Sequence, residues 1–386
     1  MKTKFHSQLL CILVALSATP HLRAEIPLSV RREGQAALNR GMDWLIARQN
    51  EKGHWSSPDW PALTALPVWA LSLSPRRESE AVNKGVDYLL SHAKENGAIY
   101  VPPREDVRGG GKPNYNTAIA MVALHLSGRE DARPHVMRAR EYIANTQHLE
   151  GDVFFGGFGY DAETDRAYAD LSNTYIAAEA MRLTEDVEDF RTEGERVDFN
   201  RAALADFVSR TQNRPESNNA DWVSDHPDDV GGFAYHPESA RGLTRVDEDG
   251  KVTFRSFGSM TYAGMLSLIY ADVDRNDPRV RSAADWSVRH WTVEENPGFG
   301  QEGYYYFMNV LTKSLAAFGQ DILRREDGSE INWRLEVINR LTSLQRIDEN
   351  GNGYWVNENN RYWEGNPDLV TAYTLIALQV ALGEAE

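Results

Sequence analysis

The feature that most constrains this chain is a helix–turn pattern that recurs along it. The first copy, Arg40–Trp55, begins as a helix that ends near Gln49, and a turn at Gly53 leads to Trp55. Its apolar face is marked by Leu38, Met42 and Leu45. Variants of the pattern follow at Lys84–Leu89, Arg138–Gln147, Ala202–Gln212, Val280–Trp291 and Trp333–Gln345. A recurring unit of this size predicts an array of helical hairpins.

Each copy is followed by a second helical stretch that is apolar almost all round. These stretches are Ala62–Leu71, Asn116–Leu124, Thr174–Met181, Met260–Ile269, Met308–Ala317 and Val370–Leu382. A helix that is apolar on every side is buried on every side, whereas the first helix of each pair carries charged side chains. The sequence therefore predicts an all-α fold in which six helical hairpins close into an α/α toroid, a single barrel. An open solenoid is the alternative, but its ends would require polar caps.

The sequence of one connection between helices predicts a pair of strands. The segment Leu243–Phe254 alternates around Asp249-Gly250, which is a strong hairpin turn signal. It predicts a small β-hairpin insertion just before an inner helix. We expect this hairpin near one mouth of the ring, either as a lid over a site or as a stabilising flap.

The first 24 residues have the features of a secretory signal peptide. Lys2 and Lys4 form a basic start, and Leu9–Ala18 is a short apolar run. Cleavage near Ala24 predicts a secreted or periplasmic mature domain of residues 25–386. The apolar run is shorter than the roughly 20 residues that a bilayer requires, so we expect no stable membrane span.

The cysteine content and the net charge restrict the classes of function that this chain could have. The single cysteine, Cys11, lies within the leader, so the mature chain would have no thiol for a disulfide, a nucleophile or a metal ligand. The formal net charge is −16 and no basic cluster stands out, whereas nucleic-acid binding depends on neutralising phosphates with Lys and Arg. No P-loop or dinucleotide fingerprint is present. We therefore expect no nucleic-acid partner and no cofactor.

The residues of the first copy match a known repeat, the QW repeat, at Arg40-Gly41, Trp44-Leu45, Gln49, Gly53 and Trp55. Through this repeat the chain resembles squalene-hopene cyclases, oxidosqualene cyclases and the β subunits of protein prenyltransferases. The resemblance covers nearly the whole mature chain and implies the terpenoid cyclase/prenyltransferase toroid in one copy. It implies a structural role for the motif, in which the Gln amide bonds near a helix end and the Trp ring packs against the neighbouring repeat.

In these families the chemistry sits where the inner helices begin, and the corresponding segment here is Asp170–Thr174. It resembles the D-x-D-D-T-A motif of class II terpene cyclases, whose central Asp protonates an alkene or epoxide. Asp170 and Thr174 keep their places, but Ser172 and Asn173 replace the paired Asp. The segment also resembles the D-x-C of protein prenyltransferases, with Ser172 in place of the zinc-binding Cys. Both the acid motif and the zinc site are thus degraded, and we expect no metal.

Asp170, Ser172 and Asn173 are also preferred helix N-cap residues, and replacing such a cap by Ala costs about 1 kcal/mol. A capping Asp can still face a cavity, so Asp170 stays a catalytic candidate beside the capping interpretation. Asp229, which precedes Gly231-Gly232-Phe233, is the candidate for a second carboxylate near the mouth.

Polar and aromatic residues begin several inner helices. The candidate ligand-binding residues are Tyr115, Asn116, Ser172, Asn173, Thr174, Ser259, Tyr262 and Tyr305. Converging on one mouth, they would form an aromatic pocket with a few polar groups, although each ring alone also fits a core position. Asp348–Gly353 resembles the start of an EF-hand loop, but Asn359 stands where a bidentate Glu is expected, so we predict a turn.

Three functions remain open. The first is an exported protein that encloses an apolar small-molecule ligand, for example an isoprenoid, as a carrier or as an enzyme of altered chemistry. The second is a carbohydrate-active enzyme on the same toroid, with Asp170 and Asp229 as a carboxylate pair. The third is a non-catalytic interaction module for a protein partner. The repeat resemblance and the aromatic helix starts favour the first.

Overall fold

Twelve α-helices alternate between two layers in the computed structural model, which describes residues 25–103, 105, 110–161, 168–246 and 249–384. The outer helices are α1 (Leu28–Arg48), α3 (Glu80–Ser91), α5 (Arg133–Asn145), α7 (Arg201–Ser209), α9 (Pro278–Arg289) and α11 (Trp333–Ser343). The inner helices are α2 (Ala62–Ser72), α4 (Pro113–Ser127), α6 (Leu171–Leu183), α8 (Gly258–Tyr270), α10 (Tyr304–Phe318) and α12 (Pro367–Leu382). Short 3-10 helices are η1 (Pro75–Glu78), η2 (Glu130–Ala132), η3 (Glu185–Phe190) and η4 (Arg361–Trp363). The expected leader, residues 1–24, lies outside the described residues.

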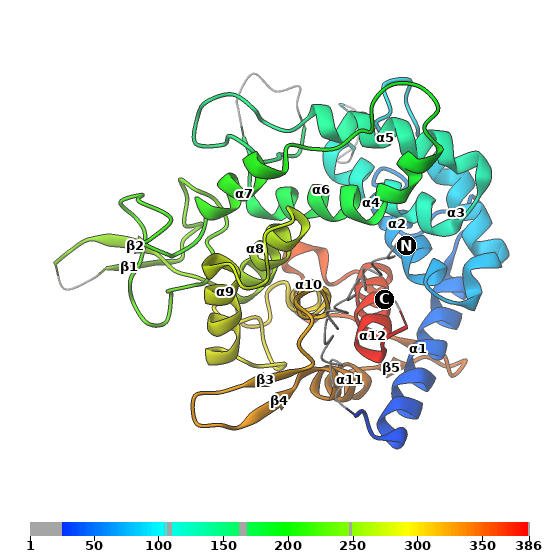
Figure 1. The fold of residues 1–386 in the computed structure, drawn as a ribbon. Coiled ribbons are helices and arrows are strands. Elements are labelled where there is room, and N and C mark those ends of the chain that lie inside the picture. The colour runs from blue at the N-terminus through cyan, green and yellow to red at the C-terminus, as the bar shows by residue number, and fades with distance from the viewer. Residues whose placement is uncertain (1–24, 104, 106–109, 162–167, 247–248, 385–386) are drawn as a thin grey trace, which may run out of the picture.

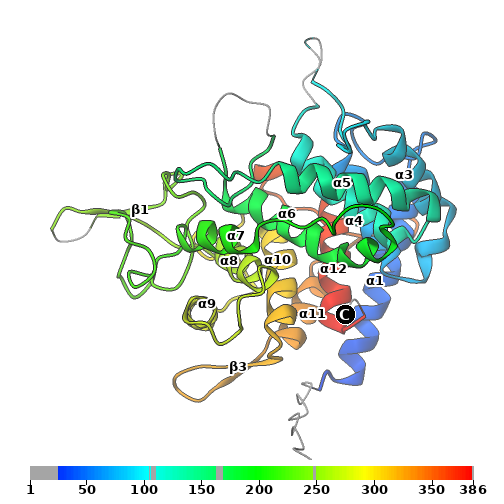
Figure 2. The same ribbon diagram turned by 45° about the horizontal axis from the view of Figure 1, so that its top comes forward.

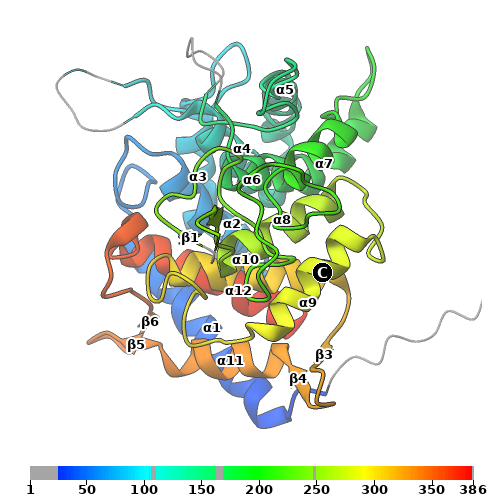
Figure 3. The ribbon, with the colours of Figure 1, turned by 90° about the vertical axis from the view of Figure 1, so that its left-hand side faces the viewer.

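The six inner helices form a closed ring. Each packs against the next in the order α2, α4, α6, α8, α10, α12, and α12 packs back against α2. The first outer helix, α1, lies beside α11 and α12, so the two ends of the chain meet (Figures 1 and 3). The predicted toroid of six helical hairpins is therefore confirmed, and the chain does not form the alternative, an open solenoid.

The burial of the two layers follows from their sequences. Every residue of α12 from Asp368 to Leu382 is buried, because this helix has the ring on one side and outer helices on the other. In α3, by contrast, burial recurs at the three- and four-residue spacing of an amphipathic helix. The same division between an apolar inner helix and a one-faced outer helix holds around the ring.

A glutamine at the end of an outer helix ties that helix to the next one. The Nε2 of Gln49 donates to the carbonyl of Gly53 in its own turn and, at 2.8 Å, to that of Ala81 in α3. The same pair of bonds recurs at Gln147 and Gln212. Gln345 completes the circuit, since its Nε2 donates to the carbonyl of Ala37 in α1 at 2.8 Å. These amides join four of the six neighbouring pairs of outer helices, including the last to the first.

Turn glycines and inner-helix threonines fix each hairpin. Gly156 has φ +89°, and a Cβ there would meet the carbonyl oxygen of Ala203 in the next outer helix at 1.8 Å. Only glycine fits this combination of left-handed backbone and close approach. Threonine hydroxyls of inner helices accept the backbone N–H that follows such a turn, in the pairs Trp55–Thr64, Ile99–Thr117, Phe158–Thr174, Phe233–Thr261 and Trp355–Thr371.

Arginines cap the C-terminal ends of five inner helices, α4, α6, α8, α10 and α12. The guanidinium of Arg140 is buried and donates to the carbonyl of Met181 at the end of α6, while its Nε pairs with Glu188 at 3.0 Å. Comparable bonds from arginine to a terminal carbonyl join Arg77 to Ser127, Arg201 to Tyr270, Arg275 to Ala317 and Arg334 to Val380. A cation at a helix C-terminus satisfies unpaired carbonyls and opposes the negative end of the helix dipole.

Among the described residues, three short β-hairpins lie in the connections: β1 (Thr244–Val246) with β2 (Val252–Phe254), β3 (Ile322–Arg324) with β4 (Glu330–Asn332), and β5 (Arg346–Ile347) with β6 (Gly353–Tyr354). The first is the hairpin predicted from Leu243–Phe254, and it projects from the ring in both views (Figures 1 and 2). The other two were not predicted. Among the helices of the described part, none is both long and apolar enough to cross a bilayer.

The Gln345 amide provides a test of ring closure. Gln345→Ala removes its bond to Ala37 and the acceptor that Arg40 Nε uses at 2.8 Å. Because these bonds join the last outer helix to the first, we expect the free energy of unfolding in urea to fall by about 1–3 kcal/mol.

The matched control is Gln301→Ala, since Gln301 is exposed and its amide bonds to Glu294 in its own loop. We expect this control to lose less than about 0.5 kcal/mol. Equal losses in the two variants would show that this joint does not hold the ring closed.

Candidate functional site

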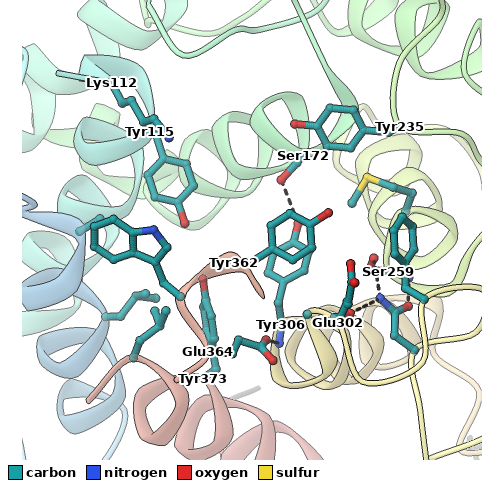
Figure 4. A pocket seen from close by; sticks show the side chains of 18 of the residues that line it. Lys112, Tyr115, Ser172, Tyr235, Ser259, Glu302, Tyr306, Tyr362, Glu364 and Tyr373 are labelled. Atoms are coloured by element: carbon teal, nitrogen blue, oxygen red, sulfur yellow. Dashed lines mark hydrogen bonds between the residues drawn. The ribbon is translucent and has the colours of Figure 1, made fainter. Parts of the chain in front are cut away.

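A cavity of about 320 Å³ opens where the inner helices begin. All six contribute to its lining, through Leu63 of α2, Tyr115 of α4, Ser172 of α6, Ser259 of α8, Tyr306 of α10 and Tyr373 of α12 (Figure 4). Since arginines cap the opposite ends of five of these helices, the cavity lies at the ends whose dipoles are positive.

The walls are mainly aromatic. Ten aromatic rings line the cavity: Trp60, Tyr115, Tyr160, Tyr235, Phe257, Phe299, Tyr306, Tyr362, Trp363 and Tyr373. Aliphatic contacts come from Leu63, Leu66, Met260 and Leu369. The polar groups are fewer, and two of them meet across the cavity, where the hydroxyls of Ser172 and Tyr306 lie 3.2 Å apart (Figure 4). The volume and composition match those of small-molecule sites.

The structure divides the predicted ligand-binding residues into two groups. Tyr115, Asn116, Ser172 and Ser259 line the cavity, whereas Asn173, Thr174, Tyr262 and Tyr305 are buried beside it without lining it. Successive residues of a helix point about 100° apart, so only one or two residues of each first turn can face the centre.

Each residue of the second group has another contact. The hydroxyl of Thr174 accepts from Phe158 N, and the rings of Tyr262 and Tyr305 pack against Phe307 and Tyr304. Asn173 bonds to Asp170. On α10 the cavity residue is therefore Tyr306, the neighbour of the one predicted.

Asp170 caps α6. Its Oδ1 accepts from Asn173 N at 2.8 Å and its Oδ2 from Asn173 Nδ2 at 2.7 Å. The side chain is buried and lies behind the cavity wall, of which Tyr235 is part. Burial raises the pKa of Asp170, while these hydrogen bonds and the hydroxyls of Tyr235 and Tyr168 favour the ionised form. The Asp170 carboxylate thus acts as the N-cap of α6, as the capping interpretation predicted.

Asp229 belongs to a different network. Its Oδ2 accepts from Arg245 Nε at 3.0 Å and from the Ser224 hydroxyl, and its Oδ1 accepts from Ser256 N. Arg245 lies in β1, so this carboxylate anchors the projecting hairpin to the ring. Asp170 and Asp229 share no hydrogen-bonding partner within the described residues. Neither β1 nor β2 lines the cavity, an arrangement that favours the flap over the lid.

Glu364 was missed in the sequence. Its buried carboxylate accepts from the backbone N–H groups of Tyr305 and Tyr306, at 3.2 and 2.8 Å, and from Asn357 Nδ2 at 2.7 Å. It therefore caps α10 from a distant loop, and burial raises its pKa. Glu364 lies just before the inner helix α12, and residues at the starts of the other inner helices also line the cavity. This shared position was the signal that could have identified Glu364.

Two cations at the cavity, Lys112 and Arg241, were also missed. The Lys112 ammonium lies 4.4 Å from the Tyr160 ring centroid, and the Arg241 guanidinium 3.8 Å from that of Tyr235. Burial lowers the pKa of Lys112, and nearby Asp170 partly offsets this effect. Single basic residues in loops carry no sequence signature that distinguishes them from surface residues.

Backbone strain is concentrated at this cavity. Six residues other than glycine have a positive φ in the described chain, and four of them line the cavity: Lys112, Arg241, Tyr362 and Trp363. Such conformations cost about 1–3 kcal/mol each and persist where the surrounding structure enforces them, often at ligand sites. Tyr362 and Trp363 are also half-exposed aromatic side chains at the rim.

A buried ion pair lies deeper in the ring. Lys313 Nζ is 3.1 Å from Glu179, whose Oε2 also accepts from the Tyr175 hydroxyl at 2.9 Å. The ammonium sits 4.3 Å from the Trp69 ring centroid. A smaller space of about 20 Å³ reaches this pair and shares three tyrosines with the main cavity: Tyr115, Tyr306 and Tyr373. The ion pair thus marks the floor below the aromatic walls.

The described residues contain no group of three or more His, Cys, Asp or Glu side chains placed to hold a metal ion. At the EF-hand-like segment, Asp348 Oδ1 accepts from Asn350 N and Asn352 N, each at 2.9 Å. This is the turn between β5 and β6, as predicted from the sequence.

Solved structures show what this architecture is similar to. The type II terpene cyclase MstE from Scytonema, in complex with its product merosterolic acid A, superimposes with a TM-score of 0.53 at 14% identity, over 92% of this chain and 99% of that one. Candida albicans protein geranylgeranyltransferase-I complexed with GGPP has a TM-score of 0.52 at 12% identity, over 89% and 90% of the two chains. The GH76 α-mannanase BT2949 of Bacteroides thetaiotaomicron has a TM-score of 0.52 at 11% identity, over 91% and 96%.

No protein-family model matches the chain, and no curated protein matches it in sequence. At these identities the solved structures establish the fold alone. The chain has an α/α-toroid fold similar to that of these terpene cyclase, prenyltransferase and mannanase structures.

Proposed function

We propose that this chain is an exported protein that binds an apolar ligand of the isoprenoid class in its central cavity. The observation that carries the proposal is the cavity itself, walled by ten aromatic rings where all six inner helices begin. Apolar walls with a few placed polar groups are the usual composition of a small-molecule site. An interaction module without chemistry or ligand would have no need for such a cavity.

The ligands of the structural neighbours support this class of ligand. MstE has been solved with geranylgeranyl dihydroxybenzoate as substrate, and the Candida transferase with GGPP. Fold likeness alone is a weak guide to chemistry, since the same toroid carries a mannanase. For this reason the proposal rests on the aromatic lining, and neither Asp170 nor Asp229 is among the residues that line the cavity, which speaks against a glycosidase pair there.

The proposed activity is binding and not acid-initiated cyclisation. Ser172 and Asn173 occupy the places of the paired Asp in the class II motif, and neither side chain is an acid strong enough to protonate an alkene. The remaining carboxylate, Asp170, holds the start of α6 from behind the wall. Ser172 also stands in place of the zinc-binding Cys, so the thiolate that activates a transferase site is missing.

Filling the cavity tests the proposed binding. In Ser172→Trp a bulky ring enters the space between α6 and Tyr306, so we expect farnesol, as an apolar C15 probe, to bind at least about tenfold more weakly, because a filled cavity buries less ligand surface. Isothermal titration measures the affinity. The control Ser343→Trp adds the same ring at an exposed position of α11 and should leave the affinity unchanged.

Unchanged farnesol binding in Ser172→Trp would contradict the proposed site. A wild-type protein whose melting temperature rises with mannose oligosaccharides but not with farnesol would favour the carbohydrate function instead.

Replacing Asp170 separates capping from acid chemistry. A raised pKa means that the folded chain binds a proton more readily than the unfolded chain, so the ionised carboxylate weakens stability above its folded pKa, and this loss disappears as the pH falls through that value. Asp170→Asn keeps a cap acceptor without the buried charge. We expect its free energy of unfolding at pH 8 to equal or exceed that of the wild type, and its farnesol affinity to be unchanged.

Asp170→Ala is the matched variant, because it removes the cap, and we expect it to lose about 1 kcal/mol. Urea denaturation at pH 5 and pH 8 measures both variants. A wild-type preparation that cyclises an isoprenoid, and loses that activity in Asp170→Asn, would overturn the binding-only proposal.

Export is tested at the N-terminus. Expressed with its own leader in a secreting bacterium, the protein should be recovered outside the cytoplasm with its first residue near Glu25, as determined by mass spectrometry. Intact chains that begin at Met1 and stay in the cytoplasm would contradict this part of the proposal.

A further inference from the structure

Lys112 is a cation at the cavity whose contacts among the described residues are aromatic rings. It lines the cavity from the start of α4, and within the part of the chain that the structure describes its ammonium makes no hydrogen bond or ion pair. Its contacts are the faces of Tyr160 and Trp60, at 4.4 and 5.7 Å from the ring centroids. In a chain with 57 acidic and 41 basic residues, a carboxylate partner would be easy to provide. The lack of such a partner among the residues that the structure describes leaves the charge available to a ligand.

Arg241 is the second such cation. Its Nη2 donates to the Tyr168 hydroxyl at 3.0 Å and its guanidinium lies over the Tyr235 ring, but it forms no ion pair with a carboxylate among the described residues. The rings of Tyr160 and Tyr168 stack at 6.4 Å with an 8° interplanar angle, so the same tyrosine cluster supports both cations. This cluster also places Lys112 and Arg241 on one wall.

Both cations are held by a strained backbone. Lys112 has φ 51° and Arg241 has φ 47°, a region that side-chain-bearing residues rarely adopt. Charged residues that only solubilise the surface gain nothing from such a conformation. Strain at a cavity wall fits residues whose position matters for a ligand.

The opposite wall carries the other sign of charge. In Figure 4, Lys112 and Tyr235 lie along the upper edge of the cavity, and Glu302 and Glu364 lie along the lower edge. The cavity is thus polarised, with its positive side at the starts of α4 and α6. A ligand with one charged end would be oriented by this arrangement.

We propose that Lys112 and Arg241 form the head-group subsite for an amphiphilic monoanion, the carboxylate of an apolar acid. This inference rests on the proposed function, because the apolar tail would occupy the aromatic cavity. A carboxylate matches the planar fork of a guanidinium, and an ammonium supplies the second point charge.

A diphosphate fits this wall less well. Two cations balance one or two negative charges, and the same cavity contains Glu302 and Glu364, with Asp170 directly behind the wall. A group with three charges would leave negative charge unpaired in a low-dielectric site, which is costly. The structure therefore assigns the subsite to the carboxylate.

The test compares probes that share one C15 tail: farnesoic acid, farnesol and farnesyl diphosphate. With the whole mature chain at neutral pH, we expect isothermal titration to show that the acid binds about tenfold more tightly than the alcohol, and also more tightly than the diphosphate. Equal affinities for acid and alcohol would overturn the head-group assignment while leaving the apolar site intact. Tightest binding of the diphosphate would overturn the monoanion assignment.

Variants assign the preference to the two residues. Lys112→Asn and Arg241→Asn remove the charge, and asparagine tolerates the left-handed backbone of these positions. Each should reduce the acid-over-alcohol preference several-fold, and the double variant should bind acid and alcohol alike. Lys112→Arg keeps the charge and should keep the preference.

Lys94→Asn is the matched control, since Lys94 also lies over a tyrosine ring, that of Tyr100 at 5.8 Å, but does not line the cavity. A preference that survives in the double variant, or that falls equally in the control, would overturn the proposal. Failure of all three C15 probes to bind would instead remove the apolar site and the subsite together, so the two failures are distinguishable.

Discussion

The interaction on which the structure depends is the side-chain amide at the end of an outer helix. Gln49, Gln147, Gln212 and Gln345 each bridge to a backbone carbonyl of the next outer helix, and Gln345 reaches the first one. This joint recurs at four of the six junctions between outer helices, so that these neighbours meet in nearly the same way. The turn glycines and the inner-helix threonines serve the same end, because they set how each hairpin approaches its neighbour.

Closure also decides where a site can form. Inner helices all run in one direction, so their C-terminal carbonyls gather at one end of the ring and their N-terminal amides at the other. Arginines donate to the terminal carbonyls of five inner helices at the first end. At the other end the helices begin with aromatic and small polar residues, and the space between them stays open. The polarity of the helices therefore places the cavity before any specific side chain does.

Within this frame the side chains at the start of α6 differ from those of the families that the sequence resembles. The start of α6 retains one carboxylate, and that carboxylate is engaged in capping the helix. The charged groups of the cavity come instead from segments between the helices: Glu364 caps α10 from the segment before α12, and Lys112 and Arg241 stand on strained backbone beside stacked tyrosines. A toroid thus keeps its scaffold while loop residues set what the cavity can hold.

The sequence by itself determined the architecture, because the repeat period, the apolar inner helices and the Asp249-Gly250 turn are local patterns that depend on neighbouring residues alone. It also located the site at the helix starts, and Tyr115, Asn116, Ser172 and Ser259 do line the cavity. Only the tertiary structure decided which side of each helix faces the centre, since a change of one residue rotates a side chain by about 100° and separates Tyr306 from Tyr305. It alone also brought in Glu364, Lys112 and Arg241, whose roles arise from loops that pack across the ring and leave no periodic trace in the chain.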